Sequence, residues 1–118
     1  MTTPSSIEPA QLPPTIRGYL RARAARDTDA ALRAFTPTAV VVDQDESFRG
    51  TERILGFLRE AGAEFSYTTE LIGARRIDDA HWVATNRLEG DFPGGVADLD
   101  YRFTLSGDLI AELVIAPR

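Results

Sequence analysis

The stretch AHWVATNRLEGDFPGGVADLDYRFTLSGDLIAELVIA, residues 80–116, decides the fold of this chain. Its apolar and polar residues alternate in long runs, which is typical of β-strands that bury one face. Together with the segment before it, the stretch divides into extended segments at 65–77, 80–92, 96–105 and 109–116, separated by Asp78-Asp79, Pro93-Gly94-Gly95 and Ser106-Gly107-Asp108. Residues of these types form tight turns, so the pattern predicts an antiparallel meander. Strands of this length twist and coil, and Gly73 and Gly90 are the expected bending points.

Alternation assigns each side chain of the meander to one of two faces. The inner, apolar face is expected to hold Trp82, Ala84, Asn86, Leu88, Leu99, Tyr101, Phe103, Leu105, Leu109, Ala111, Leu113 and Ile115. The outer face is expected to mix aliphatic and charged residues, namely Val83, Ile110, Val114, Arg87, Glu89, Asp98, Asp100, Arg102 and Glu112. Charges of both signs beside aliphatic area suit a self-complementary interface, so this face predicts a homodimer. A solvated antiparallel sheet is the alternative.

The chain before the meander begins with a region that lacks a periodic apolar pattern. Residues 1–13 contain Thr, Ser and several prolines, and they predict a flexible tail ahead of a single domain at 14–118. Pro14 suits the first turn of a helix, and the apolar residues after it recur at helical spacing. Arg17, Arg21, Arg23 and Arg26 are left for the solvated side of that helix.

Two further helices and one strand are expected between residues 27 and 62. A short helix follows the capping sequence Asp27-Thr28-Asp29, buries Leu32 and Phe35, and ends at Pro37. The apolar run at 39–42 predicts a buried strand that ends at Asp43. A third helix after Gly50-Thr51 is expected to pack through Ile54, Phe57, Leu58 and Ala61 and to stop at Gly62. Helices first and a meander second is the α+β arrangement.

Composition narrows the classes of function. The 118 residues carry a net charge of −5, include no cysteine and include one histidine, His81. Disulfides, thiolate chemistry and a metal site with several histidines are therefore excluded within one chain. The negative charge argues against nucleic acid and anionic membranes as partners, and no apolar run is long enough to span a bilayer. A cytoplasmic location is the default expectation, and no cofactor or metal is expected.

The order of these elements resembles the nuclear transport factor 2-like superfamily, which includes ketosteroid isomerases and SnoaL-like polyketide cyclases. The residues that carry the resemblance are Tyr19-Leu20, Arg26-Asp27-Thr28-Asp29-Ala30-Ala31-Leu32, Phe35, Ala39-Val40-Val41-Val42-Asp43, Phe48-Arg49-Gly50, Ile54, Phe57, Tyr101-Arg102-Phe103 and Ser106-Gly107-Asp108-Leu109-Ile110. The resemblance implies a cone-shaped, curved antiparallel sheet covered by three N-terminal helices, as in cystatin-like folds, around an apolar pocket. It also implies dimerisation through the outer face of the sheet.

Asp43 is the leading candidate for chemistry. It ends a strand of valines, so its carboxylate is expected at the edge of an apolar cavity, where desolvation raises the pKa and makes a better base near neutrality. The resemblance places Asp43 where ketosteroid isomerases keep their general base and Tyr19 where they keep a tyrosine that binds the oxyanion. It implies that Asp43 removes a proton beside a carbonyl while Tyr19 donates a hydrogen bond to the developing enolate.

A second oxyanion donor of the isomerases, a protonated aspartic acid, has no counterpart here. Leu99 occupies its place, and alternation turns Asp98 and Asp100 to the opposite face. We expect Asn86 or Trp82 to supply a replacement N–H group. The pocket is expected to be lined by Phe35, Phe57, Trp82, Asn86, Leu88, Leu99, Tyr101 and Phe103 and to bind a small hydrophobic molecule.

Other interpretations stay open at this point. Tyr19 can be a packing residue, Asp43 can bond the backbone of the following turn, and Asn86 can be a satisfied core amide. The cone can then be filled by its own side chains, which leaves a non-catalytic dimerisation or ligand- and partner-binding module. A SnoaL-like cyclase or hydrolase on the same scaffold is a further alternative.

Overall fold

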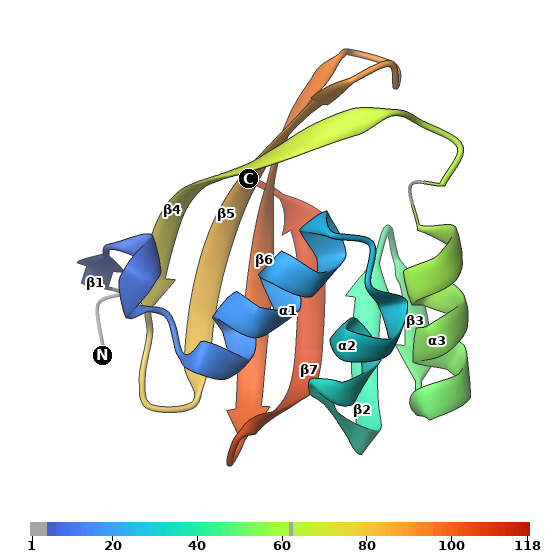
Figure 1. The fold of residues 1–118 in the computed structure, drawn as a ribbon. Coiled ribbons are helices and arrows are strands. Elements are labelled where there is room, and N and C mark those ends of the chain that lie inside the picture. The colour runs from blue at the N-terminus through green and yellow to red at the C-terminus, as the bar shows by residue number, and fades with distance from the viewer. Residues whose placement is uncertain (1–4, 62) are drawn as a thin grey trace.

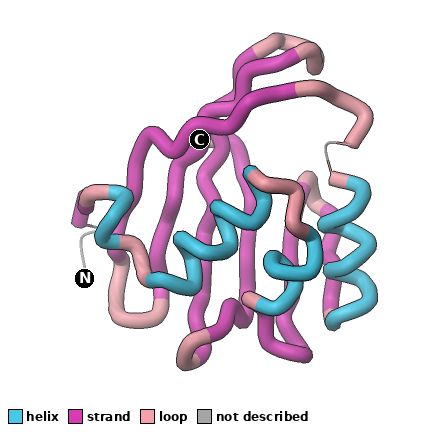
Figure 2. The backbone as a smooth tube through the Cα atoms, in the orientation of Figure 1, coloured by secondary structure: helices cyan, strands magenta, loops and turns pink. Residues whose placement is uncertain are grey.

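The structure, a computed structural model, describes residues 5–61 and 63–118. Over these residues the strands form one sheet in the order β1-β4-β5-β6-β7-β2-β3. The element bounds are β1 (Ser5–Ile7), a 3-10 turn η1 (Pro9–Gln11), α1 (Pro14–Ala24), α2 (Thr28–Arg33), β2 (Phe35–Asp43), β3 (Glu46–Arg49), α3 (Thr51–Glu60), β4 (Tyr67–Arg76), β5 (His81–Gly90), β6 (Val96–Ser106) and β7 (Leu109–Pro117). Figure 1 shows α1, α2 and α3 on one side of the sheet, and Figure 2 shows how strongly the strands curve.

The α+β fold class and the meander are confirmed. Strands β4 to β7 pair antiparallel with their neighbours, and their ends lie within two residues of the predicted boundaries. Gly73 lies at a register shift in the β4–β5 ladder, where the bend was expected. The β2–β7 pair is parallel, so the sheet is mixed at this one point.

The core lies between α1 and the concave face of the sheet. Ile16 and Tyr19 of α1 are buried there, as are Phe103 of β6 and Leu113 of β7. The helix begins with Pro14 at its first turn, where the missing N–H is not needed, and Arg21 and Arg23 lie in its last turn, where positive charge complements the helix dipole. This packing fixes α1 across the mouth of the curved sheet.

Phe35 lies in β2 and not in the second helix as predicted. The side chain of Asp27 accepts a hydrogen bond from the backbone N–H of Ala30 and caps α2, which ends at Arg33. Phe35 then pairs with Ile110 of β7, and the ladder is irregular until Val40. Pro37 lies inside this irregular stretch, where its missing N–H interrupts no regular pairing.

The β2–β3 hairpin was missed by the sequence analysis. Asp43 pairs with Glu46 across a turn formed by Gln44 (φ 52°) and Asp45 (φ 65°). Two left-handed residues in succession match the type I′ turn that fits the twist of a hairpin. Asn-Gly and Asp-Gly are the usual sequences for that turn, and Gln-Asp does not resemble them.

Residues 5–13 are packed and do not form the free tail that the sequence predicted. Ile7 pairs with Ala74 of β4, and Leu12 is 2 % exposed because it inserts into the core. The apolar side chains of Ile7 and Leu12 favour this packing, and the prolines between and after them have no backbone N–H group that would need an acceptor. The rest of the predicted tail, residues 1–4, and the expected helix stop at Gly62 lie outside the described residues.

Ile110 and Leu109 have exchanged the faces of the sheet that the sequence predicted for them: Ile110 was expected outside and Leu109 inside. Ile110 is fully buried in the core, whereas Leu109 is 37 % exposed. The β6–β7 ladder shifts register between Thr104 and Leu105, and Leu105 pairs with Ile110 while Thr104 pairs with Glu112. Ala111 is thus an extra residue in β7, and such a bulge inverts the alternation on one side of it.

Candidate functional site

A cavity of about 920 Å³ opens beside α1. Its wall is built from η1, α1, the start of α2, the end of α3 and the first half of β4. Leu20, Leu58 and Leu71 supply apolar surface, and Asn86 of β5 and Tyr101 of β6 form part of the same wall. The strong curvature of β4, which runs from the α3 side of the molecule across the sheet in Figure 1, leaves this space between strand and helices.

Asp43 is half-buried at the end of β2. It follows Val41 by two residues, and Val41 is fully buried, so both side chains share the inner face of the sheet. Its strand neighbour in β7 is Ile115, which is also buried. Burial raises the pKa of Asp43, the Arg23 guanidinium opposes this rise, and the Glu46 carboxylate adds to it. The predicted desolvation of this carboxylate is therefore present.

Tyr19 is buried on the side of α1 that packs on the sheet, and its hydroxyl group has no hydrogen-bond partner within the described residues. Its ring packs edge to face against Phe35 (5.3 Å between centroids) and Phe103 (5.9 Å). Within the described part of the chain no group hydrogen-bonds to its Oη atom. Burial raises the pKa of Tyr19, the Arg23 charge lowers it, and the charges of Tyr101 and Asp43 raise it further. The hydroxyl keeps its proton and remains a free donor.

Tyr101 and Asn86 bring polar groups to the cavity wall. Burial raises the pKa of Tyr101 to about 12, so this hydroxyl is protonated at neutral pH and can donate a hydrogen bond. Asn86 is 3 % exposed and pairs with Leu99 in the β5–β6 ladder. Asn86 also forms part of the cavity wall, so its side-chain amide can meet a bound ligand.

Arg23 is the residue that the sequence analysis missed. Its Nη1 atom donates to the Leu58 carbonyl oxygen (2.9 Å), and its guanidinium carbon lies 5.9 Å from the centroid of the Phe57 ring. Its charge lowers the pKa values of Asp43, Tyr19 and Tyr101. Arg23 follows Tyr19 by about one helical turn and therefore lies on the same face of α1. This spacing could have predicted that Arg23, unlike the solvated arginines, points towards the site.

The other predicted lining residues lie elsewhere. Phe35, Phe57 and Phe103 are buried in the hydrophobic core, and Leu99 packs against it. Leu88 is half-buried in β5. Of all the predicted residues, Asn86 and Tyr101 are the ones in the cavity wall. Asp43 and Tyr19 are not part of this wall, but both lie near enough to Arg23, which is, for its charge to affect their pKa values.

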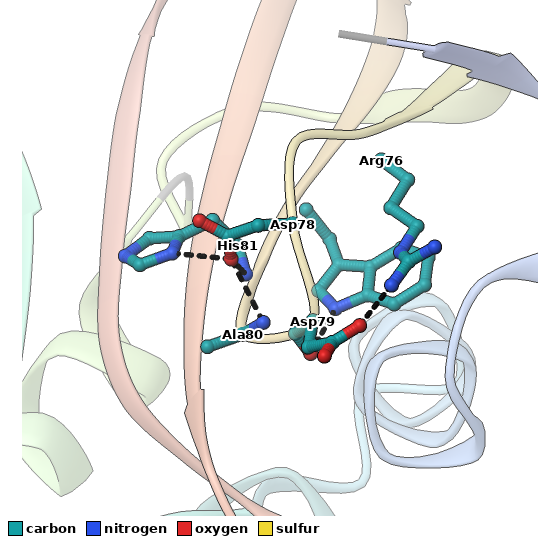
Figure 3. A network of polar contacts seen from close by, with 6 residues as sticks. Arg76, Asp78, Asp79, Ala80 and His81 are labelled. Atoms are coloured by element: carbon teal, nitrogen blue, oxygen red, sulfur yellow. Dashed lines mark hydrogen bonds and ion pairs between the residues drawn. The ribbon is translucent and has the colours of Figure 1, made fainter. Parts of the chain in front are cut away.

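Trp82 lies near the start of β5 and contacts the β4–β5 turn. Its indole N–H donates to the Asp79 carbonyl oxygen (3.3 Å), and its ring faces the Arg76 guanidinium at 5.5 Å. Beside it, Asp78 Oδ1 contacts His81 Nδ1 and accepts from the backbone N–H groups of Ala80 and His81, bonds that hold the pKa of Asp78 below its usual range (Figure 3). The indole N–H is thus already used, which removes Trp82 as the replacement donor.

Neither a metal-binding cluster nor a membrane-spanning helix is found among the described residues. In the described ranges, no group of three or more His, Asp or Glu side chains is arranged to hold a metal ion. None of the helices that the structure describes is long and apolar enough to cross a bilayer. The polar groups described so far are the Asp43 carboxylate, the Tyr19 and Tyr101 hydroxyls, the Asn86 amide and the Arg23 guanidinium.

Comparison with known proteins reveals relatives among solved structures. No family model matches the chain, and no curated protein matches it. A proposed polyketide cyclase from Sinorhizobium meliloti is 31 % identical, with a TM-score of 0.85 over 93 % of this chain and 100 % of its own. An NTF2-like protein of unknown function from Cytophaga hutchinsonii is 10 % identical, with a TM-score of 0.71 over 88 % of this chain and 87 % of its own. The protein RV0760c from Mycobacterium tuberculosis, in complex with estradiol-17beta-hemisuccinate, is 14 % identical, with a TM-score of 0.72 over 88 % of this chain and 91 % of its own.

Proposed function

This chain belongs to the nuclear transport factor 2-like superfamily, and we propose that it binds a small, largely apolar molecule in the cavity beside α1. The observation that carries the proposal is the cavity itself, about 920 Å³ in volume, with leucines and a few polar groups in its wall. Small-molecule sites are concave, mostly apolar and provided with a small number of fixed polar groups, and their volumes are roughly 300–1,000 Å³.

We further propose that Asp43, which lies near Arg23 of the cavity wall, carries out an acid–base step on an enolisable carbonyl compound. The Asp43 carboxylate takes a proton from the carbon beside the carbonyl, and the resulting enolate oxygen accepts hydrogen bonds from neutral tyrosines. Where a carbon–carbon double bond adjoins the deprotonated carbon, the enolate is a dienolate, and Asp43 returns the proton to its far carbon, which shifts the double bond and completes an isomerisation. The raised pKa of Asp43 supports this role because a general base works best when its pKa approaches the working pH.

Two tyrosines suit the enolate. The Tyr19 hydroxyl is buried and has no partner within the described residues, so donating to an enolate would satisfy it. Tyr101 lies two residues after Leu99 on the same face of β6. Because the Leu99 side chain cannot donate a hydrogen bond, we propose that the Tyr101 hydroxyl is the second donor to the enolate oxygen. An aldol-type cyclisation begins with the same proton removal beside a carbonyl. The resemblance to a proposed polyketide cyclase is therefore compatible with this chemistry.

A non-catalytic binding domain is the second candidate, and one observation favours it. Asp43 and Tyr19 are absent from the cavity wall, and the rings of Phe35 and Phe103 pack against Tyr19. In this case the cavity binds its ligand and no proton moves. RV0760c, solved in complex with estradiol-17beta-hemisuccinate, illustrates that a protein of similar fold can hold a small organic ligand.

Deuterium exchange distinguishes the two candidates without knowledge of the natural substrate. We expect the protein to accelerate exchange of the protons beside the carbonyl of 2-tetralone in D₂O, followed by NMR. Asp43→Asn should reduce the rate by about 10²–10⁴-fold, the usual contribution of a positioned base. Asp108→Asn, at an exposed turn, is the matched control. Binding of 2-tetralone without exchange would leave the non-catalytic candidate, and no thermal shift with any of a broad panel of apolar ketones would argue against the binding site itself.

A further inference from the structure

The wall of the cavity is rich in arginine. Although the chain as a whole is acidic, with a net charge of −5, five arginines line this one opening: Arg17, Arg21, Arg23, Arg26 and Arg59. No Asp or Glu side chain accompanies them among the lining residues of the described chain. The opening is therefore a local positive region on an otherwise negative molecule.

These arginines differ from those on the outer face of the sheet. There, Arg87 forms a bidentate pair with Asp98 (2.9 and 3.1 Å), and Arg75 pairs with Asp100 (3.1 Å). Within residues 5–61 and 63–118, none of the cavity arginines forms an ion pair with a carboxylate. Arg23 lies near enough to Asp43 to lower its pKa, although no ion pair joins the two side chains within the described residues. Their charge is available to a ligand.

The five cavity arginines differ in how far they are buried. Arg17 and Arg23 are half-buried and are oriented by backbone carbonyls, because Arg17 Nε donates to Leu12 O (2.9 Å) and Arg23 Nη1 to Leu58 O (2.9 Å). Each keeps further N–H donors free of those bonds. Arg21, Arg26 and Arg59 are exposed at the rim. Arg26 has a left-handed backbone (φ 58°) just after α1, at a position where glycine is common, and in this conformation it forms part of the rim.

We infer that the ligand of this cavity carries an acidic group, a carboxylate or a comparable anion, at one end of an apolar body. The inference rests on the proposed function, because it assigns the charge of the molecule that the cavity binds. The apolar body packs on Leu20 and Leu71, and the anion lies between the rim arginines, whose planar guanidinium groups suit bidentate pairing with a carboxylate. The same charges attract such a ligand from solution despite the overall negative charge of the protein.

A matched pair of probes tests the inference: 2-naphthylacetic acid and its neutral amide, titrated by calorimetry into the full chain. We expect the acid to bind about tenfold more tightly than the amide, and the difference to shrink at high salt, because charge-assisted hydrogen bonds strengthen the acid's binding alone and salt screens exposed charges. The triple variant Arg21→Gln, Arg26→Gln, Arg59→Gln should bind both probes equally. A control triple, Arg33→Gln, Arg49→Gln, Arg53→Gln, removes the same charge away from the cavity and should keep the preference.

The outcomes separate this inference from the proposed function. Equal binding of acid and amide to the wild-type protein would overturn the anionic ligand and leave the apolar cavity in place. Tighter binding of the acid that survives the rim triple would overturn the assignment to these arginines. Failure of both probes to bind would count against the binding site and the inference together. Because the substituted side chains of the rim triple are exposed, circular dichroism should show an unchanged fold.

Discussion

At the scale of single residues, Asp43 combines an acidic side chain with an apolar setting. Burial raises its pKa above the ordinary 3.8, so the folded protein binds this proton more tightly than the unfolded chain. As pH rises through the range between the unfolded and folded pKa values, the unfolded state releases its proton first and stability falls. At neutral pH the ionised Asp43 therefore lowers the stability of the fold.

Asp43→Asn is accordingly expected to raise the melting temperature at neutral pH. The gain should disappear as pH is lowered past the folded pKa towards 3.8, because Asp43 then becomes as neutral as asparagine. Thermal unfolding measured over a pH series checks this, with Asp108→Asn as the control at an exposed position. A lower melting temperature for Asp43→Asn at neutral pH would show that the folded state stabilises the charge.

Tyr19 and Tyr101 differ in burial, and their Phe variants should separate stability from function. Tyr19→Phe keeps the edge-to-face ring contacts and removes an unpartnered buried hydroxyl, so we expect about 1 kcal/mol more stability in urea unfolding. If that hydroxyl serves the enolate, 2-tetralone exchange should slow by about 10²-fold in the same variant. Tyr101→Phe should weaken ligand binding with little change in stability. A loss of stability in Tyr19→Phe would reveal a hidden partner of the hydroxyl.

At the scale of elements, the close approach of β5 to the start of β4 depends on Gly90. A Cβ atom at this position would lie 2.7 Å from Tyr67 Cα and closer still to the Ser66 carbonyl oxygen. At Gly73 the nearest atom to an added Cβ would be 3.8 Å away, an ordinary contact. Gly90 is therefore required by packing against backbone, whereas Gly73 only accommodates a bend.

Gly90→Ala should thus destabilise the protein by about 1–3 kcal/mol, the usual cost of overpacking. Gly73→Ala, the matched control, should change stability by less than about 1 kcal/mol. Urea unfolding of both variants measures the difference. Equal effects would mean that the start of β4 can move away from Gly90 at little cost. Because Tyr67 and Thr68 line the cavity, Gly90→Ala should also weaken ligand binding.

The β2–β3 hairpin offers a second test at this scale. Gln44 and Asp45 adopt left-handed backbones that asparagine and glycine adopt more easily. The double variant Gln44→Asn, Asp45→Gly is expected to stabilise the protein by about 1 kcal/mol. Thermal unfolding is the measurement, and no gain would indicate that contacts of Gln44 or Asp45 offset the relieved strain.

At the scale of the whole molecule, the outer face of the sheet is the proposed dimer interface. Its charged residues are partly satisfied within the chain: Asp100, 6 % exposed, accepts hydrogen bonds from Thr85 and Arg75, and Arg87 holds Asp98. Charges paired in this way can be covered at lower cost than unpaired ones. At the ends of the sheet, β1 and β3 are short, which limits edge-to-edge association. The broad face is therefore the better surface for self-association.

We expect a homodimer in analytical ultracentrifugation, and Val114→Arg on the outer face should shift it to monomer. Gly18→Arg adds the same charge on the exposed side of α1, where an added side chain meets no neighbour, and should leave the dimer intact. A wild-type monomer at high protein concentration would exclude this interface and favour the solvated sheet.

Much of the architecture could be predicted because its signals are local. Two-residue alternation and turn residues placed β4 to β7, and the helical spacing after Pro14 placed α1. The valines before Asp43 indicated a desolvated carboxylate, which the structure contains. These features depend on residues close together in the chain, so the sequence by itself determined the α+β class, the meander and the character of Asp43.

The site was decided by the tertiary structure. A single bulge in β7 moved Ile110 into the core, and the curvature of β4 opened the cavity beside α1 rather than among the core phenylalanines. The packing of α1 on the sheet brought Arg23 near Asp43 of β2 and Tyr101 of β6, residues far apart in the chain. Periodicity specifies which face a side chain takes but not how far a sheet bends or where its register slips. Those quantities follow from packing summed over the whole molecule, which is why the arginine-lined cavity became evident only in the folded chain.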